Sequence, residues 1–389
     1  MSVRWEIKWG IALSLLGSAV SSQAEEISTP EIPAQLTSFN LSEEWESVGC
    51  DPCLGCDSSH AYGSHTHRPD EHAPAGIMGA HVHDRGEIML EYKYMNMYMD
   101  DNRIGTTTVS DLDAFDFNGT NVLFSPTQMT MEMHMVHAMY GLTDDITLYT
   151  MVMFTGLTMD HQRNPNRPFI PDDSFFTTHN SGFDDTSLGA LWQVIDTDMD
   201  RVILNLGCSV PTGDLTRRSA APFDFPTRPP MLPSDGELPY PMRRGSGTFD
   251  ARPGVTWVRE WEDASFGSQV QMDLPIGRNF DDYAVGNEYR LNNWLAVVPM
   301  DWVSFSFRVE HIWKDNYRGA DGDLIPMAIS TARPDMRGGY WLNFGYGINT
   351  VVLNGHRLAA ELVHNVYQDL DGIQLETDWY FACSWSKAW

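Results

Sequence analysis

The 389-residue sequence predicts an all-β protein: a transmembrane, antiparallel, up-and-down β-barrel of about 12 strands, preceded by an extended N-terminal periplasmic segment. Three observations predict this fold. From Glu87 onward, apolar and polar residues alternate with the period of two that is typical of strands with two different faces. The connections between these stretches are alternately short and long, as in outer-membrane barrels. The final stretch ends the chain on an aromatic residue, Trp389.

The amino-acid composition excludes several classes of protein. The chain has 25 Lys and Arg against 53 Asp and Glu, a net charge of −28, so it offers no basic surface to the phosphates of a nucleic acid. Apolar residues make up 42% of the chain, which argues against disorder. After the N-terminus no stretch reaches the roughly 18 uncharged apolar residues of a membrane-spanning helix, whereas barrel strands need apolar residues only at alternate positions.

The first 24 residues are typical of a secretory signal peptide. Arg4 and Lys8 form a short basic region, and residues 9–20 form an apolar core that is too short for a membrane anchor. Ser22 and Ala24 place small residues at positions −3 and −1 of a cleavage site, so we expect cleavage after Ala24. An exported β-barrel is expected to lie in the outer membrane of a Gram-negative bacterium. Its outer face would then contact outer-membrane lipid.

The exported chain divides into two parts. Residues 25–85 contain Pro, Ser, His and acidic residues with little periodic pattern, so we expect a mostly irregular, Cys/His-rich segment after the signal peptide (1–24). Residues 86–389 carry the alternation and are assigned to the barrel.

The irregular segment contains a candidate metal site. Thiolate and imidazole ligands suit copper and zinc, the two metals that this composition favours. The candidate ligands are Cys50, Cys53, Cys56, His60, His65, His67, His72, His81 and His83. The alternative is a disulfide between two of these cysteines within a flexible polar linker, which an oxidising compartment favours.

The strands are expected in order along the rest of the chain. They lie near residues 87–99, 127–140, 145–156, 185–195, 201–212, 247–258, 265–275, 283–297, 301–314, 337–351, 356–367 and 374–389. Long polar loops are expected near 100–126, 157–184, 213–246 and 315–336, and shorter loops near 276–282 and 368–373. Short turns are expected between the other strands. A soluble β-sandwich also alternates, but aromatic residues near the strand ends and charges of both signs in mid-strand favour the membrane barrel.

The polar faces of these strands assign several charged residues to the lumen. The expected lumen-facing residues are Glu91, Lys93, Glu288, Arg290, Arg308, Glu310, Arg357 and Glu361. Glu288 with Arg290, Arg308 with Glu310, and Arg357 with Glu361 each share one face, since residues two or four apart on a strand point the same way. These pairs are expected to tune the lumen. The chain has no catalytic motif such as GxSxG or HExxH, so we predict that it is not an enzyme.

Methionine is concentrated in the first strands, with 12 of the 21 residues within 89–159. On the first strand, Met95, Met97 and Met99 share the expected lumen face and are candidate ligands for a soft metal ion. On the second strand we expect the methionine face to be the lipid face, because Glu132 and His134 on the other face require water. The alternative is that methionine is a flexible apolar filler. Cys208 and Cys383 fall on expected lipid faces.

Three short segments carry a resemblance to a known family. They are MYGLTDDITLYT (139–150), LNLGCSVPTGD (204–214) and GSGTFDARPGVTW (245–257), followed by the aromatic end of the chain. In this order and spacing the chain resembles the outer-membrane channel family named after the meta-cleavage pathway of phenol degradation, and the Met/His-rich first third is similar to a subgroup of it. The resemblance implies a barrel that passes small, often hydrophobic, compounds.

The sequence therefore predicts a passive outer-membrane channel, or porin-like transporter, for a small hydrophobic compound or a soft metal ion. One alternative is an outer-membrane protein that sequesters copper or zinc through its N-terminal Cys/His segment. A second alternative is a secreted β-sandwich that acts as a binding module without a pore.

Overall fold

The computed structural model describes residues 68–116, 121–166, 175–215, 218–219, 236–352 and 355–389, all within the compact unit formed by residues 63–389. The strands of the barrel wall are β1 (Ile88–Gly105), β3 (Phe124–Gly141), β4 (Ile146–Arg163), β5 (Phe175–Phe183), β6 (Thr186–Asp196), β7 (Asp200–Val210), β10 (Phe249–Glu260), β11 (Ala264–Ile276), β13 (Glu288–Met300), β14 (Val303–Lys314), β16 (Gly339–Val352) and β17 (His356–Ala388). The smaller elements are β2 (Thr107–Val109), η1 (Asp113–Phe115), β8 (Arg218–Ser219), β9 (Gly236–Glu237), η3 (Tyr240–Met242), β12 (Tyr283–Ala284), β15 (Arg318–Gly319), η4 (Ser330–Ala332) and η5 (Pro334–Met336). None of the helical turns in this part of the chain is long and apolar enough to cross a membrane.

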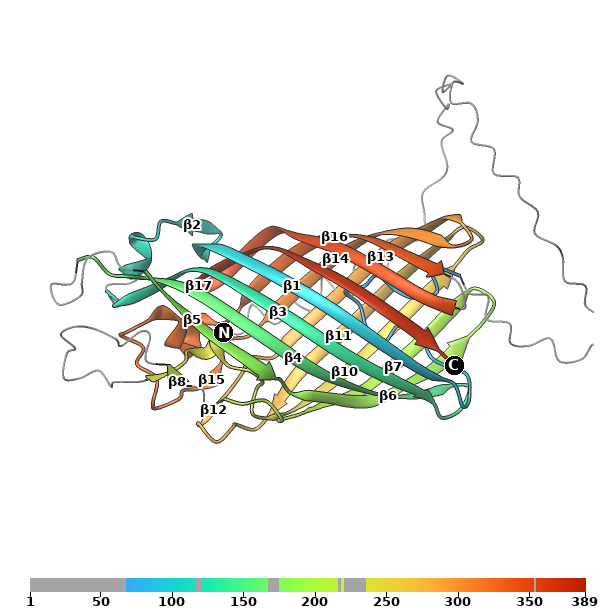
Figure 1. Ribbon diagram of the computed structural model, residues 1–389, viewed down its shortest axis with the longest axis horizontal. Coiled ribbons are helices and arrows are strands. Elements are labelled where there is room, and N and C mark those ends of the chain that lie inside the picture. Colours follow the sequence, from blue (N-terminus) through green and yellow to red (C-terminus); the bar gives the residue numbers. More distant parts are fainter. Residues whose placement is uncertain (1–67, 117–120, 167–174, 216–217, 220–235, 353–354) are drawn as a thin grey trace, which may run out of the picture. The chain divides into compact units, whose positions relative to one another are not determined.

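Eleven strands form a closed antiparallel ring (Figure 1). The order around the ring is β1, β3, β4, β6, β7, β10, β11, β13, β14, β16 and β17, and β17 pairs back onto β1. Strand β17 crosses the wall twice: residues 356–370 pair with β16 and residues 370–388 pair with β1. The chain turns near Gly372, whose φ of 84° lies in the region that glycine adopts at little steric cost. The predicted all-β barrel is confirmed, and the closed ring excludes a β-sandwich.

The two ends of the barrel differ (Figure 1). Short turns of a few residues join β3 to β4, β6 to β7, β10 to β11 and β13 to β14 at the end where the chain terminates. The longer connections gather at the opposite end and carry the small elements β2, β8, β12 and β15. Three of these connections, residues 236–248, 277–287 and 315–338, pack on one another and on the barrel interior, and we call them the cap.

The two faces of the wall differ in chemistry. Large apolar side chains are exposed on the outer face, as a lipid environment requires. They include Leu148, Val152, Leu188, Leu206, Val255, Leu295, Phe305, Phe307, Tyr346, Ile348, Leu358, Leu362 and Trp379. The residues that alternate with these along each strand point inward. They are buried and mostly polar, so the interior is a polar core packed with side chains. Cys208 and Cys383 are unpaired thiols on the outer face.

Two features of the wall differ from the predicted strands. Strand β5 lies in the expected loop 157–184, where it pairs with the second half of β4. Strands β1, β3 and β4 are 18 residues long, whereas β7 and β10 have 11 and 12, close to the 9–11 residues that cross a bilayer. The extra length of β4 and the neighbouring β5 carry polar residues such as Thr158 and His179 on the outer face. The alternation therefore fades there, and the sequence pattern gives no strand signal.

Candidate functional site in the barrel interior

A buried arginine connects two strands across the interior. Arg308 on β14 donates two hydrogen bonds to the carboxylate of Glu361 on β17, from Nε at 2.7 Å and from Nη2 at 3.1 Å. Arg308 also lies 3.0 Å from Glu310 and donates to the amide oxygen of Asn292 and to the hydroxyl of Tyr380, at 2.8 and 2.7 Å. Arg308, Glu310 and Glu361 are each 1% exposed. Every group in this cluster is paired, as buried charges in a protein require.

The network continues along the wall through Glu288 and Arg290 of β13 and Lys314 of β14. Arg290 lies 2.6 Å from Glu288 and 3.5 Å from Glu310. Lys314 lies 3.8 Å from Glu288. Tyr380, Asn343 and Lys314 were not singled out from the sequence, although their position on the inward face follows the same alternation. Which of these residues contact one another depends on the register between neighbouring strands, which the pattern does not determine.

The other three expected lumen residues lie close to the segment that precedes β1 or to the histidine of a neighbouring strand. Glu91 and Lys93 on β1 are 3.6 Å apart, and Glu91 also lies 3.4 Å from His137 on β3. Arg357 at the start of β17 donates to the backbone carbonyl of Arg68 at 2.9 Å and forms an ion pair with Glu71. These contacts connect the wall to the segment that precedes β1.

Residues 68–86, which we call the plug, run inside the barrel before the chain enters β1. Wall side chains pair with backbone groups of the plug, which has no strand or helix of its own to satisfy them. Glu361 accepts a hydrogen bond from the Gly76 amide at 2.7 Å, and Asn349 donates to the carbonyl of His72 at 2.8 Å. Ile77 packs against Trp294 on the wall. We expected this segment on the periplasmic side, and no pattern in it indicates that its last part fills the lumen.

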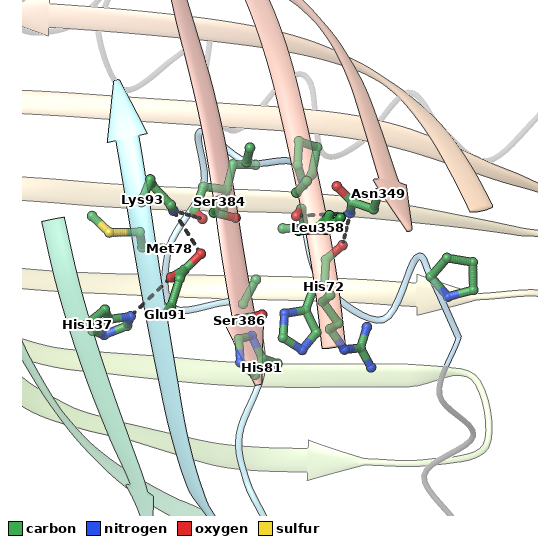
Figure 2. A pocket seen from close by; sticks show the side chains of 18 of the residues that line it. His72, Met78, His81, Glu91, Lys93, His137, Asn349, Leu358, Ser384 and Ser386 are labelled. Atoms are coloured by element: carbon green, nitrogen blue, oxygen red, sulfur yellow. Dashed lines mark hydrogen bonds and ion pairs between the residues drawn. The ribbon is translucent and has the colours of Figure 1, made fainter. Parts of the chain in front are cut away.

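A small cavity lies between the plug and the wall (Figure 2). Figure 2 shows His72 and His81 of the plug together on one side, and Glu91 joined to both Lys93 and His137 on the other. The rings of His72 and His81 are stacked with centroids 3.8 Å apart. The cavity has a volume of about 40 Å³, enough for a few water molecules or an ion but not for an organic solute.

A larger interior cavity of about 180 Å³ lies farther along the lumen, toward the cap. Its charged lining residues are Asp184, Asp185, Asp250, Asp273, Glu288, Arg252 and Lys314. Five carboxylates against two cations give this cavity an excess of negative charge, which attracts cations. Of these seven residues, sequence analysis assigned only Glu288 to the lumen. Asp184 and Asp185 lie between β5 and β6, and Asp250 lies at the start of β10, where the alternation gives no signal.

Methionine side chains line the part of the interior formed by β1, β3 and β4. Met89, Met129, Met135, Met139, Met151 and Met159 are buried there, and the candidate ligands Met95, Met97 and Met99 lie half-buried on the inward face of β1. At the cap end, Met129 and Met159 pack with Met242 of η3. One side of the interior is therefore thioether-rich and the other is charged.

The expectation that the methionine face of β3 meets lipid was wrong. Met129, Met135 and Met139 are buried inside, and Glu132 and His134 are exposed outside. The two polar residues lie where the outer face changes from apolar to polar along β3, so they do not need the lumen to remain hydrated. Both side chains form hydrogen bonds with tyrosine hydroxyls of β1. The Tyr92 hydroxyl lies 2.7 Å from Nδ1 of His134, and the Tyr94 hydroxyl donates to the Glu132 carboxylate at 3.2 Å.

The cap is held by one buried arginine. Arg243 lies 2.9 Å from Glu237 and 3.4 Å from Asp281, and it also pairs with Asp321. Its guanidinium lies over the ring of Tyr283, where burial raises the pKa of the phenol to about 12. Among the described residues, Glu237, Asp321 and Asp323 form the one group of three potential metal-ligand side chains with mutually close oxygens. Arg243 and Arg218 already compensate that charge, so the group needs no cation.

The predicted metal ligands fall into separate places. Cys50, Cys53, Cys56, His60, His65 and His67 lie outside the described residues. His72, His81 and His83 are in the plug, where their rings form a continuous row: His72 stacks on His81, and His83 meets His81 edge-on with centroids 5.0 Å apart. Met95, Met97 and Met99 belong to the methionine wall of β1 and are not grouped with these histidines in the cavity lining.

Comparisons with known proteins were made for the whole chain. No model of a known protein family matches it, and no curated protein matches it. Among solved structures, an outer membrane channel from Pseudomonas putida F1 is similar over 79% of this chain and 97% of its own, with 13% identity and a TM-score of 0.53. A FadL homologue from Pseudomonas aeruginosa (10% identity, 77% of this chain, 90% of its own, TM-score 0.42) and the Pseudomonas putida toluene transporter TodX (10%, 81%, 91%, TM-score 0.38) are more distant. The first similarity shows that this chain shares the β-barrel fold of that protein.

Proposed function

We propose that the protein is a passive channel of the Gram-negative outer membrane that passes a small solute, and that the plug and the cap close it in the conformation described. No catalytic step is part of this proposal. The single observation that supports it best is the inverted distribution of polarity. A closed ring of strands with apolar side chains outside and ion pairs inside is stable in a bilayer, where an open sheet edge is not.

The closed state follows from the contents of the interior. The plug occupies one end of the lumen through contacts such as that of Gly76 with Glu361, and the cap covers the other end through Arg243 and Met242. Solute passage therefore requires that the plug or the cap move. Neither is covalently joined to the wall at these contacts, so movement costs only non-covalent interactions.

Two classes of cargo suit the interior. The methionine wall is compatible with a small hydrophobic compound, because thioether side chains are apolar and adapt their shape. The same wall and the acidic cavity near Asp250 support a soft metal ion, because thioethers are soft ligands and carboxylates attract cations.

Ion conductance of the purified full-length protein in planar bilayers tests the proposal. A methyl carbon added at Gly76 would lie 2.5 Å from Arg308 Nη2 and 2.6 Å from Glu361 Oε2, so Gly76→Val should dislodge the plug from the wall. Gly322→Val is the matched control, because nothing lies within 4 Å of its added carbon. We expect rare, small openings for the wild type and for Gly322→Val, and frequent openings for Gly76→Val.

Two outcomes separate the alternatives. Reversal potentials that favour cations, together with release of Ag⁺ from loaded liposomes, would support an ion as cargo, whereas flux of a small aromatic compound without Ag⁺ release would support a hydrophobic one. Folded protein that neither conducts nor passes any of these solutes, in the wild type and in Gly76→Val, would refute the channel.

A further inference from the structure

Two neighbouring histidines of the plug each have a buried ring nitrogen without a partner. Among the described residues, neither Nε2 of His81 nor Nε2 of His83 makes a hydrogen bond. The rings are 5.0 Å apart between centroids and nearly perpendicular, at 86°. Because metal–imidazole bonds are about 2.0–2.1 Å, two rings that share one ion have centroids up to roughly 6 Å apart. The centroid distance of 5.0 Å is therefore within the range for two rings that share one ion.

The local chain explains why both rings point the same way. Val82, between them, packs into the apolar cluster of Met89 and Leu191 on the wall. In an extended chain alternate side chains point to opposite sides, so His81 and His83 are turned away from that cluster together. The backbone amide of His83 donates to the hydroxyl of Thr147 at 2.8 Å, which holds this conformation against β4.

A carboxylate orients the ring of His83. Nδ1 of His83 lies 2.9 Å from the Glu87 carboxylate, and the side chain of His83 is only 6% exposed. A carboxylate accepts a hydrogen bond, so in the neutral tautomer that fits this contact the proton is on Nδ1 and Nε2 has the lone pair. The same arrangement of carboxylate and imidazole orients histidine ligands in metal sites.

We propose that His81 and His83 form a binding site for a monovalent soft ion, Cu(I), inside the barrel. Two imidazoles offer no negative charge of their own, and no group of three donors at this place is complete within the part of the chain that the structure describes. Cu(I) accepts two ligands, whereas Zn(II) in structural sites takes four. Lys93, Arg357 and Glu91 line the adjacent cavity, and this excess of one positive charge disfavours a divalent ion more than a monovalent one.

The rest of the surroundings suits this ion. The stacked ring of His72 covers one face of His81 and shields it from water. The site does not depend on conduction, so it stands or fails separately from the proposed channel.

The test is an anaerobic Cu(I) titration of the full-length protein in detergent, against a chromophoric Cu(I) chelator. Cys50, Cys53 and Cys56 are changed to Ser in every sample so that thiols do not bind the ion. We expect one equivalent of Cu(I) with an X-ray absorption spectrum of imidazole nitrogen. His81→Gln/His83→Gln should abolish this binding, and His134→Gln/His179→Gln, two exposed histidines on the outer face, should leave it unchanged.

A second variant keeps both imidazoles and guards against a folding defect. Glu87→Gln removes only the carboxylate that orients His83, and loss of such a partner weakens metal binding by about 10–100-fold. Heat-modifiable migration on a gel reports whether each variant is folded. Unchanged Cu(I) affinity in folded His81→Gln/His83→Gln would overturn the site. So would a spectrum of sulfur ligands alone, which would place the ion at the methionine wall.

Discussion

Replacing Arg308 with Met tests whether the interior network holds the barrel together. Arg308→Met keeps a side chain of similar length but removes the guanidinium group. In the wild type, Nε and Nη2 of this group donate hydrogen bonds of 2.7 and 3.1 Å to the Glu361 carboxylate. Glu310 keeps Arg290 at 3.5 Å and the hydrogen bond from Tyr380, so most of the damage falls on Glu361.

The magnitude follows from burial. Arg308 and Glu361 are each 1% exposed, so water cannot replace the lost partner. Removing one partner of a buried ion pair costs about 3–5 kcal/mol, because the other charge is left uncompensated. The double variant Arg308→Met/Glu361→Gln removes that stranded charge, and it should be more stable than Arg308→Met alone.

Urea unfolding of the barrel in detergent micelles, followed by tryptophan fluorescence, measures the free energies. Arg259→Met is the matched control: Arg259 pairs with Asp200 at 2.7 Å, but on an exposed part of the wall, where ion pairs contribute little. A double variant less stable than Arg308→Met would refute the stranded-charge argument. A loss as small as that of Arg259→Met would show that water reaches the network.

Three further changes have clear expected results. Phe307 is on the outer face, 40% exposed, and a charge at the bilayer midplane costs about 2–4 kcal/mol, so Phe307→Arg should lower the assembled fraction on a heat-modifiability gel while Phe307→Leu does not. The backbone groups of Trp389 and Ile88 exchange hydrogen bonds of 2.9 and 3.0 Å, so deletion of Trp389 should slow refolding into liposomes, and an unchanged rate would show that this pair does not guide closure. Arg243→Gln should loosen the cap and raise the open probability in planar bilayers; an unaltered trace would mean that the plug alone closes the lumen.

The alternation of residues was sufficient to predict which residues share one face of a strand. Arg308, Glu310 and Glu361 were assigned to one side because parity is a local property of an extended chain, and the structure places them inside. The failure on β3 has a physical reason as well. The polarity of Glu132 and His134 suggested the lumen, but the strand continues past the apolar part of the wall, and both remain outside near water and tyrosine hydroxyls.

The sequence by itself therefore determined the all-β class and about 12 passes across the wall. For most strands it also determined which face points into the lumen. Tertiary structure alone decided the partners: Arg308 meets Glu361, 53 residues away, only because β14 and the two passes of β17 lie on the same side of a closed ring. It also decided the position of the plug. Residues 68–86 have no periodicity of their own, and they lie in the lumen because wall side chains such as Glu361 and Asn349 supply the hydrogen bonds that their backbone lacks.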